Sequence, residues 1–291
     1  MTAREWWREP EVSPSGPLWD EAVALLPGAA ATVTRLGGTA NSTWRVETGQ
    51  GVFVVRLHDG WVDPSGINRE RETRLQAEAA RVGLAPDIIA ADPAGCFLVT
   101  RFVQGVLWQG QDMAQPEFLR RLARRLRALH ELPAPVVEPW DLGAVLAAHA
   151  RPLAGADPAS APEFAALLAR GRDILARTVA AGRTPCIVHN DVNHTNLVGP
   201  GPMLLDFEYA AVADPLSDLA CLLAYYPEAQ PHAALLLAEA GLPGLPVPQL
   251  LDLAWVYTLV SFLWYRRYEL SGRMRPAERQ AMEALRRRLN L

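Results

Sequence analysis

The residues best suited to chemistry in this 291-residue chain lie between Cys186 and Tyr209, in the segment CIVHNDVNHTNLVGPGPMLLDFEY. Two short apolar runs flank a Gly/Pro-rich turn, a pattern that predicts a β-hairpin. The hairpin would bring Asn196, just before its first strand, close to Asp206, just after its second. An amide oxygen and a carboxylate held side by side suit Mg²⁺, which prefers oxygen ligands and completes its shell with water and phosphate.

Asp191 stands apart from this pair, on the tight turn His189-Asn190-Asp191. There its carboxylate is placed to accept a proton from a hydroxyl that attacks phosphorus. Together, Asp191, Asn196 and Asp206 have the layout of phosphoryl transfer, where catalysis is mainly positioning and neutralisation of charge on the phosphates. An Asn/Asp-rich turn and a solvated acidic hairpin would explain each fragment alone, but the ordered set with this spacing favours the catalytic interpretation.

These motifs resemble the kinase-like phosphotransferases, with H-x-D-x-x-x-x-N in the catalytic loop and D-x-[DE] on the metal strand. The nearer resemblance is to aminoglycoside phosphotransferases and choline kinases, bacterial choline kinases above all. It implies a bilobal protein-kinase-like α+β fold, with ATP and Mg²⁺ as cofactors, Asp191 as base and Asn196 and Asp206 on the metal. Glu208 would serve the metal or a cationic substrate. Only five residues separate Glu208 from Asp214, too few for a regulated activation loop, so we expect a small-molecule kinase.

The composition narrows the class of protein. With 50% hydrophobic and 21% charged residues the chain is typical of a soluble enzyme, and its net charge of −4 argues against nucleic acid as partner. The N-terminus lacks a signal-peptide core, and the most apolar stretch, Leu250–Tyr265, is too short to span a bilayer and carries Asp252. We therefore expect a cytoplasmic protein without a membrane partner. The sequence leaves the oligomeric state open.

The chain contains no lysine, since all 28 basic residues are arginine. Kinase-like folds normally use a strand lysine on the nucleotide phosphates, and by the resemblance Arg56 in the expected strand Gly51–Leu57 takes that role. The alternative is a side chain that merely reaches solvent from a sheet edge. The partner of Arg56 would lie on the charged helix predicted over Asn68–Val82. The family pattern I-[ND]-R-x-x-E selects Glu72 there, with Glu70 as the competitor.

Two further segments would contact the nucleotide. A strand, turn and returning strand are predicted over Ala31–Glu47, and the turn resembles the G-G-x-x-N segment of choline-kinase-like enzymes. Its members Gly38, Asn41 and Ser42 would offer donors to the phosphates. Farther along, Phe102 and Val103 follow a predicted strand and fit the hinge between the lobes, whose backbone would pair with adenine.

We expect two lobes, residues 1–103 with a mixed sheet and one main helix, and residues 104–291, mainly helical. Helices are predicted near Asp20–Leu26, Phe118–Leu132 and Pro162–Ala181, with one short helix within 133–162. Asp218 would open and cap a further helix, and by the resemblance it also accepts hydrogen bonds from the catalytic-loop backbone.

The substrate prediction rests on a helix expected over Leu250–Leu270. Both of its faces are aromatic, so it is either a core helix or the wall of a pocket. In the second interpretation Trp255 or Trp264, with Tyr225 or Tyr265, attracts a quaternary ammonium by cation–π interaction. The Phe-Leu-Trp step at Trp264 is similar to bacterial choline kinases. The resemblance favours a small substrate with a hydroxyl and a cationic group, namely choline or a similar amino alcohol, with thiamine also conceivable.

Two alternatives stay open. An aminoglycoside phosphotransferase would need an acidic pocket, for which the segment Pro227–Gln249 supplies only Glu228 and Glu239. A nucleotide-binding pseudokinase would not need the complete set of Asp191, Asn196 and Asp206.

Overall fold

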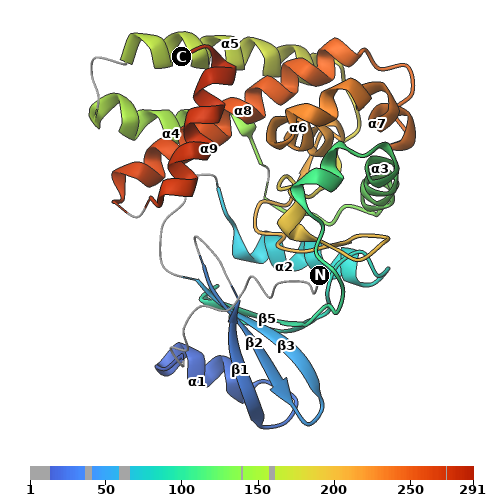
Figure 1. The fold of residues 1–291 in the computed structure, drawn as a ribbon, viewed down its shortest axis with the longest axis vertical. Coiled ribbons are helices and arrows are strands. Elements are labelled where there is room, and N and C mark those ends of the chain that lie inside the picture. The colour runs from blue at the N-terminus through green and yellow to red at the C-terminus, as the bar shows by residue number, and fades with distance from the viewer. Residues whose placement is uncertain (1–13, 37–40, 59–65, 139, 157–160, 273) are drawn as a thin grey trace.

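The computed structural model describes residues 14–36, 41–58, 66–138, 140–156, 161–272 and 274–291. An antiparallel sheet with two helices forms the N-terminal part, and helices dominate the remainder (Figure 1). The predicted kinase-like architecture is therefore confirmed. Gly38, predicted to contact phosphate, lies outside the described residues.

The N-terminal part consists of α1 (Pro17–Ala24), β1 (Ala30–Leu36), β2 (Asn41–Thr48), β3 (Gly51–His58), α2 (Arg69–Ala80), β4 (Ile88–Ala91) and β5 (Phe97–Arg101). The strand order is β1-β2-β3-β5-β4, and every pairing is antiparallel. Our expectation of a mixed sheet was wrong. The helical connection through α2 joins β3 and β4, which run in the same direction, but β5 inserts between them and pairs with both.

The side chains of β3 alternate between two faces because successive residues of a strand point to opposite sides. Phe53 and Val55 are fully buried and pack with Trp44 and Val46 of β2 in the core that α1 covers. Arg56 follows Val55 and so belongs to the opposite face, on which its partners on α2 and in the helical part lie. The alternation alone thus directs one buried cation toward the junction of the two parts.

The second part contains η1 (Gly110–Ala114), α3 (Pro116–His130), α4 (Leu142–Ala156), α5 (Ala161–Ala180), β6 (Cys186–Val188), η3 (His194–Asn196), β7 (Leu197–Val198), β8 (Met203–Leu204), β9 (Ala211–Ala213), α6 (Leu216–Tyr225), η4 (Pro227–His232), α7 (Ala233–Glu239), α8 (Val247–Leu270) and α9 (Pro276–Leu289). The short helix expected within 133–162 is in fact the 15-residue α4. Its alanine-rich sequence favours helix, and the helix continues through Pro152.

Helix α8 is the central element of the helical part, packed against α4, α5, α6 and α9 (Figure 1). With 24 residues it is longer than the apolar stretch that we expected, and by length and composition it could cross a membrane. Half of its most apolar window is nevertheless buried among the neighbouring helices. We therefore interpret α8 as a core helix.

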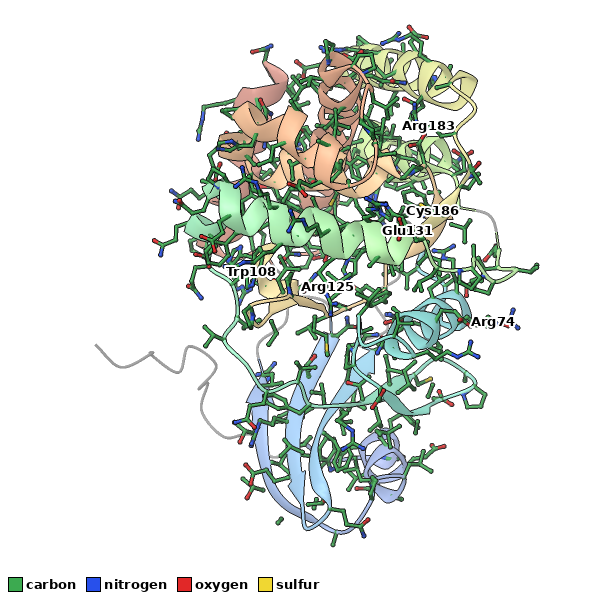
Figure 2. All side chains as sticks on the ribbon, turned by 90° about the vertical axis from the view of Figure 1, so that its right-hand side faces the viewer. Arg74, Trp108, Arg125, Glu131, Arg183 and Cys186 are labelled. Atoms are coloured by element: carbon green, nitrogen blue, oxygen red, sulfur yellow. The ribbon has the colours of Figure 1, made fainter. Side chains whose placement is uncertain are left out.

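The predicted hairpin is present as β7 and β8, which pair through Leu197–Leu204 and Val198–Met203. Arg125 of α3 donates to the carbonyl of Gly83 beyond α2 (2.6 Å) and to that of Pro202 in the hairpin turn (3.0 Å). In Figure 2 the long helix α3, which carries Arg125, lies across the helical part just above the sheet. These bonds hold the hairpin and the N-terminal part together.

Candidate active site

The loop that carries Asp191 is fixed by a carboxylate beneath it. Asp218, fully buried, accepts hydrogen bonds at Oδ1 from the backbone N–H groups of His189 (2.9 Å) and Asn190 (2.8 Å). Its Oδ2 lies 2.8 Å from His130 Nε2. The predicted bond to the loop backbone is therefore present. The predicted cap is not, because α6 already begins at Leu216 and the side chain turns to the loop instead.

Asn190 holds the sharp turn with a left-handed backbone, φ 61°, which asparagine tolerates better than most residues. Its side chain accepts a hydrogen bond from the hydroxyl of Tyr257 (2.7 Å) and donates one to the carbonyl of Tyr209 (3.1 Å). Tyr257 connects α8 to the catalytic loop, a role that the sequence analysis missed. The sequence analysis found aromatic residues on both faces of this helix, but no local pattern distinguishes a hydroxyl that reaches a loop 67 positions away.

Both carboxylate oxygens of Asp191 accept hydrogen bonds. Asn196 Nδ2 donates to Oδ2 (2.7 Å), and the hydroxyl of Tyr225 donates to Oδ1 (2.9 Å). Asn196 also donates to the backbone carbonyl of Asp191 (3.0 Å). Sequence analysis named Tyr225 only for its aromatic ring, so its contact with the predicted base is new.

The structure brings Asp206 to the same place from the other strand of the hairpin. Leu205 N donates to the carbonyl of Asn196 (2.9 Å), and Leu205 O accepts from His189 Nε2 (2.7 Å). These two bonds align the ends of the hairpin with the catalytic loop. Asp206 itself has φ 61°, which turns its carboxylate out of the strand direction.

Arg56 joins the two parts of the molecule at this point. One guanidinium nitrogen pairs with Glu72 of α2 and the other with Asp206. Glu72 is 2% exposed, whereas the side chain of Glu70 is 72% exposed and pairs with Arg74. In the structure Glu72, and not Glu70, is thus the partner of the buried Arg56, and the role of this pair at the nucleotide stays a prediction.

The pKa values follow from this burial and from the neighbouring charges. Burial, together with the charge of Glu208, raises the pKa of Asp206 above its ordinary value even though Arg56 acts in the opposite direction. Burial would also raise the pKa of Glu72, but the charges of Arg56 and Arg69 outweigh it and the pKa is lowered. The site thus concentrates more negative than positive charge and favours a bound cation.

Glu208 is buried and engaged with the N-terminal part. Its Oε2 accepts hydrogen bonds from Asn41 Nδ2 (3.0 Å) and Arg69 Nη1 (3.1 Å), and Arg69 also pairs with Glu72 (2.8 Å). Asn41 and the half-buried Ser42 begin β2, beside the turn that was predicted to bind phosphate. Arg69 was missed as a site residue, although it is the arginine of the I-[ND]-R-x-x-E pattern and that signal was available.

The predicted hinge residues follow β5 directly. Phe102 N donates to the carbonyl of Val52 (2.9 Å), and the guanidinium of Arg45 lies 5.1 Å from the Phe102 ring centre. Val103 is half-buried in the segment that leads to the helical part. Their position agrees with a hinge, and their contact with adenine stays a prediction.

The oxygen donors at the hairpin fit a magnesium ion bound mainly through a nucleotide. Within the described chain no group of three His, Cys, Asp or Glu side chains assembles a metal site by itself. The amide nitrogen of Asn196 donates to Asp191, so its amide oxygen is the atom that would contact the ion. An amide oxygen and a carboxylate are both hard oxygen ligands of the kind that Mg²⁺ prefers. Two such ligands are sufficient when the phosphates of a nucleotide supply other ligands of the ion.

The two tryptophans of the predicted aromatic wall have different surroundings. Residues two apart on a helix point in nearly opposite directions, so Trp255 faces away from the side on which Tyr257 reaches Asn190. Arg170 of α5 covers the Trp255 ring at 3.9 Å from its centre. Trp264, seven residues after Tyr257, shares the face of Tyr257 and stacks on Tyr268 (5.1 Å, 16°). The substrate contact of each tryptophan stays a prediction, and the Arg170 side chain over the Trp255 ring makes Trp264 our first choice.

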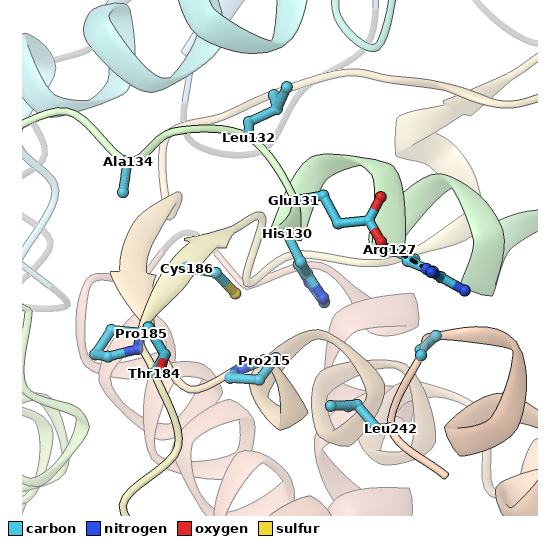
Figure 3. Close-up of a pocket in the computed structure, with 12 residues that line it drawn as sticks. Arg127, His130, Glu131, Leu132, Ala134, Thr184, Pro185, Cys186, Pro215 and Leu242 are labelled. Carbon is cyan, nitrogen blue, oxygen red and sulfur yellow. Dashed lines mark hydrogen bonds and ion pairs between the residues drawn. The ribbon is translucent and has the colours of Figure 1, made fainter.

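A depression of about 370 Å³ lies behind the catalytic loop, between the end of α3, the start of β6 and the start of α6 (Figure 3). His130 and Cys186 lie on its wall, and His130 contacts Oδ2 of Asp218, the carboxylate whose Oδ1 anchors the catalytic loop. None of the predicted site residues lines this depression, so it is not the candidate active site.

The antiparallel sheet with its charged helix, the helical second part and the anchored His-Asn-Asp loop together define a kinase-like fold. A model of the phosphotransferase enzyme family matches residues 32–251, and the chain belongs to this family. No curated protein sequence matches it.

Solved structures share the fold at low identity. A choline/ethanolamine kinase family protein from Mesorhizobium loti is 22% identical with a TM-score of 0.74, over 94% of each chain. The choline kinase LicA from Streptococcus pneumoniae is 16% identical with a TM-score of 0.76, over 94% of this chain and 97% of that one. A spectinomycin phosphotransferase in complex with ADP and spectinomycin is 10% identical with a TM-score of 0.56, over 89% and 88%.

Proposed function

We propose that this phosphotransferase transfers the γ-phosphoryl group of ATP to a hydroxyl of a small molecule, choline or a similar amino alcohol being the first choice. The observation that carries the proposal is the convergence of Asp191, Asn196 and Asp206, with the Arg56–Glu72 pair completing the set from the N-terminal part. The set supplies a base, two oxygen ligands and a cation, which are the parts that phosphoryl transfer needs.

In this mechanism Asp191 orients the acceptor's hydroxyl and takes its proton as the oxygen attacks phosphorus. Asn196 and Asp206 would hold Mg²⁺, which neutralises charge on the phosphates. Arg56, fixed by Glu72, would bind phosphate oxygens. Because its other nitrogen now pairs with Asp206, the phosphates compete with this carboxylate for the guanidinium.

The charges around the site support a small cationic acceptor and not a sugar with many ammonium groups. Glu208 is already bound to Asn41 and Arg69. Glu239, one of only two acids in the segment considered for an aminoglycoside, is paired with Arg124 of α3 (2.8 Å). Trp264, on the face of α8 that Tyr257 shares, is the aromatic residue that would contact a quaternary ammonium, which cannot donate hydrogen bonds.

The purified protein tests the proposal with MgATP and a panel of choline, ethanolamine, thiamine and an aminoglycoside, read out as ADP release and as mass of the phosphorylated product. We expect phosphorylation of choline or another amino alcohol. In the matched variant Asp191→Asn, turnover should fall by ~10²–10⁴, the usual contribution of a positioned base, while nucleotide binding persists.

The other outcomes separate the alternatives. Preferred phosphorylation of the aminoglycoside would replace the amino-alcohol assignment. Nucleotide binding without turnover of any compound on the panel would favour a pseudokinase. If the Asp191→Asn variant and the unsubstituted protein turn over at equal rates, Asp191 has no part in the mechanism.

A further inference from the structure

One contact of Asp191 has no part in the mechanism above. The hydroxyl of Tyr225 donates to Asp191 Oδ1 at 2.9 Å, while Asn196 occupies Oδ2. A hydroxyl that donates to this carboxylate is what the reaction requires of the acceptor, because a base must lie within hydrogen-bond reach of the proton that it removes. The tyrosine hydroxyl therefore occupies the position at which the acceptor's hydroxyl must bind.

The backbone on both sides of Tyr225 is held in place. Tyr225 is the last residue of α6, whose first turn carries Asp218 under the catalytic loop. The last carbonyls of a helix lack partners within it, and Arg288 of α9 donates to those of Leu223 and Ala224. The next residue, Tyr226, accepts a hydrogen bond from His194 N (2.8 Å). One rigid helix thus anchors the loop with one end and presents a hydroxyl to its base with the other.

The Tyr225 side chain can leave this position without disturbing the core. The residue is 39% exposed, although it belongs to a helix that is otherwise almost entirely buried. A rotation about its own side-chain bonds would carry the ring toward solvent and open Asp191 Oδ1. Burial of the hydroxyl and the charge of Asp191 raise the pKa of Tyr225 well above its ordinary value, so at neutral pH it is a donor and does not compete as a base.

We propose that Tyr225 is a positioning residue whose hydroxyl occupies the acceptor position at Asp191 Oδ1 between turnovers and excludes water from that position. The inference rests on the proposed function. Without the tyrosine hydroxyl, a water molecule could donate to Oδ1. Its oxygen would attack the γ-phosphorus, the bond from that phosphorus to ADP would break, and the proton would pass to Asp191, giving ADP and inorganic phosphate. An alcohol that binds through its other groups displaces Tyr225, whereas water has no such groups.

The test measures ADP release from MgATP without any acceptor, so it needs no knowledge of the substrate. The variant Tyr225→Phe keeps the ring and removes only the hydroxyl. We expect its ATP hydrolysis to rise by about tenfold to a hundredfold, the factor that one hydrogen bond to a charged group corresponds to. Its KM for the alcohol found in the panel should fall, because the alcohol no longer competes with the tyrosine. Loss of a purely structural bond would not lower this KM.

Tyr226→Phe is the matched control, since it removes a neighbouring hydroxyl that contacts His194 and not Asp191. Its ATP hydrolysis should stay at the original rate. An unchanged or slower hydrolysis in Tyr225→Phe, with phosphorylation of the alcohol intact, would overturn the inference and leave the proposed function standing. Phosphate found on Tyr225 by mass spectrometry would also overturn it, because the hydroxyl would then be an acceptor. If the protein without any substitution phosphorylates none of the compounds on the panel, the proposed function itself is excluded.

Discussion

Arg56 on β3 and Asp206 after β8 form an ion pair across 150 positions of the sequence. The same guanidinium pairs with Glu72, so a single side chain connects the sheet, helix α2 and the hairpin of the second part. In a chain without lysine, our proposal gives this arginine the charge that the site needs for phosphates. Its planar fork allows two carboxylates to be held at once, which a compact ammonium does less well.

Replacing Arg56 tests whether this charge serves the nucleotide. Arg56→Met should strongly raise the KM for MgATP and lower the free energy of unfolding by roughly 3 kcal/mol, because Glu72 loses a buried partner. Arg56→Lys should keep partial activity, since the positive charge remains while the fork is lost. Steady-state kinetics and urea unfolding measure both effects. Arg74→Met on α2 is the control, because Arg74 pairs with the exposed Glu70. Kinetics of Arg56→Met equal to those of the control would contradict the assignment.

Replacing Asp206 tests the predicted metal ligands. Asp206→Ala should abolish phosphoryl transfer, and Asn196→Ala should be less severe, because the carboxylate is the charged ligand of the pair. Activity is measured against Mg²⁺ concentration, and the Asn196 variant should need more of the ion. Asp252→Ala is a suitable control, since this aspartate pairs at the surface with Arg177 (3.1 Å). Transfer that continues in excess chelator would show that the reaction does not use the ion.

Two tryptophans of helix α8 allow a matched pair of variants that tests how the substrate is bound. Trp264→Leu should raise the KM for an amino alcohol by roughly tenfold, the loss of one cation–π contact. Trp255→Leu should leave this KM unchanged, because its ring is covered by Arg170 on the other side of the helix. Neither change should alter the KM for ATP. If only Trp255→Leu raises the KM for the alcohol, the aromatic contact has been assigned to the wrong face of α8.

We expect His58 to make the stability of the N-terminal part depend on pH. Its Nδ1 lies 2.5 Å from the carbonyl of Gly95, and its Nε2 is buried without a hydrogen-bond partner among the described residues. Burial, with the charges of Arg56 and Arg69, lowers its pKa from 6.5 to about 4. Between these values the unfolded chain binds a proton that the folded chain does not. Stability is therefore complete above pH 6.5 and falls as the pH drops toward 4, by about 3 kcal/mol at most.

Urea unfolding at pH 7.5 and pH 5 measures this loss. The variant His58→Gln keeps an amide donor for Gly95 and removes the titration. It should lose less stability than the original chain between the two pH values. Equal losses would mean that other groups cause the pH dependence.

The local features of the site could be predicted from sequence because each depends on near neighbours. The Gly/Pro turn between two apolar runs defined the hairpin that carries Asp206. The charged helix pattern placed a glutamate partner for Arg56 on α2, and the family pattern selected Glu72 over Glu70. The His-Asn-Asp loop, read with its resemblance to known kinases, indicated Asp191 and Asn196, whose catalytic roles stay predictions. The sequence also excluded lysine and left Arg56 as the buried cation of the strand.

Contacts between distant segments were decided only by the tertiary structure. Glu208 could serve metal or substrate by its position in the motif, yet the approach of β2 and α2 gives it Asn41 and Arg69 as partners. Trp255 and Trp264 are equally aromatic in the sequence, and only the packing of α5 on α8 separates them. The hydroxyl of Tyr225 reaches Asp191 because Asp218 and Arg288 fix the two ends of α6, and side chains from distant parts of the chain meet in ways that no local pattern encodes.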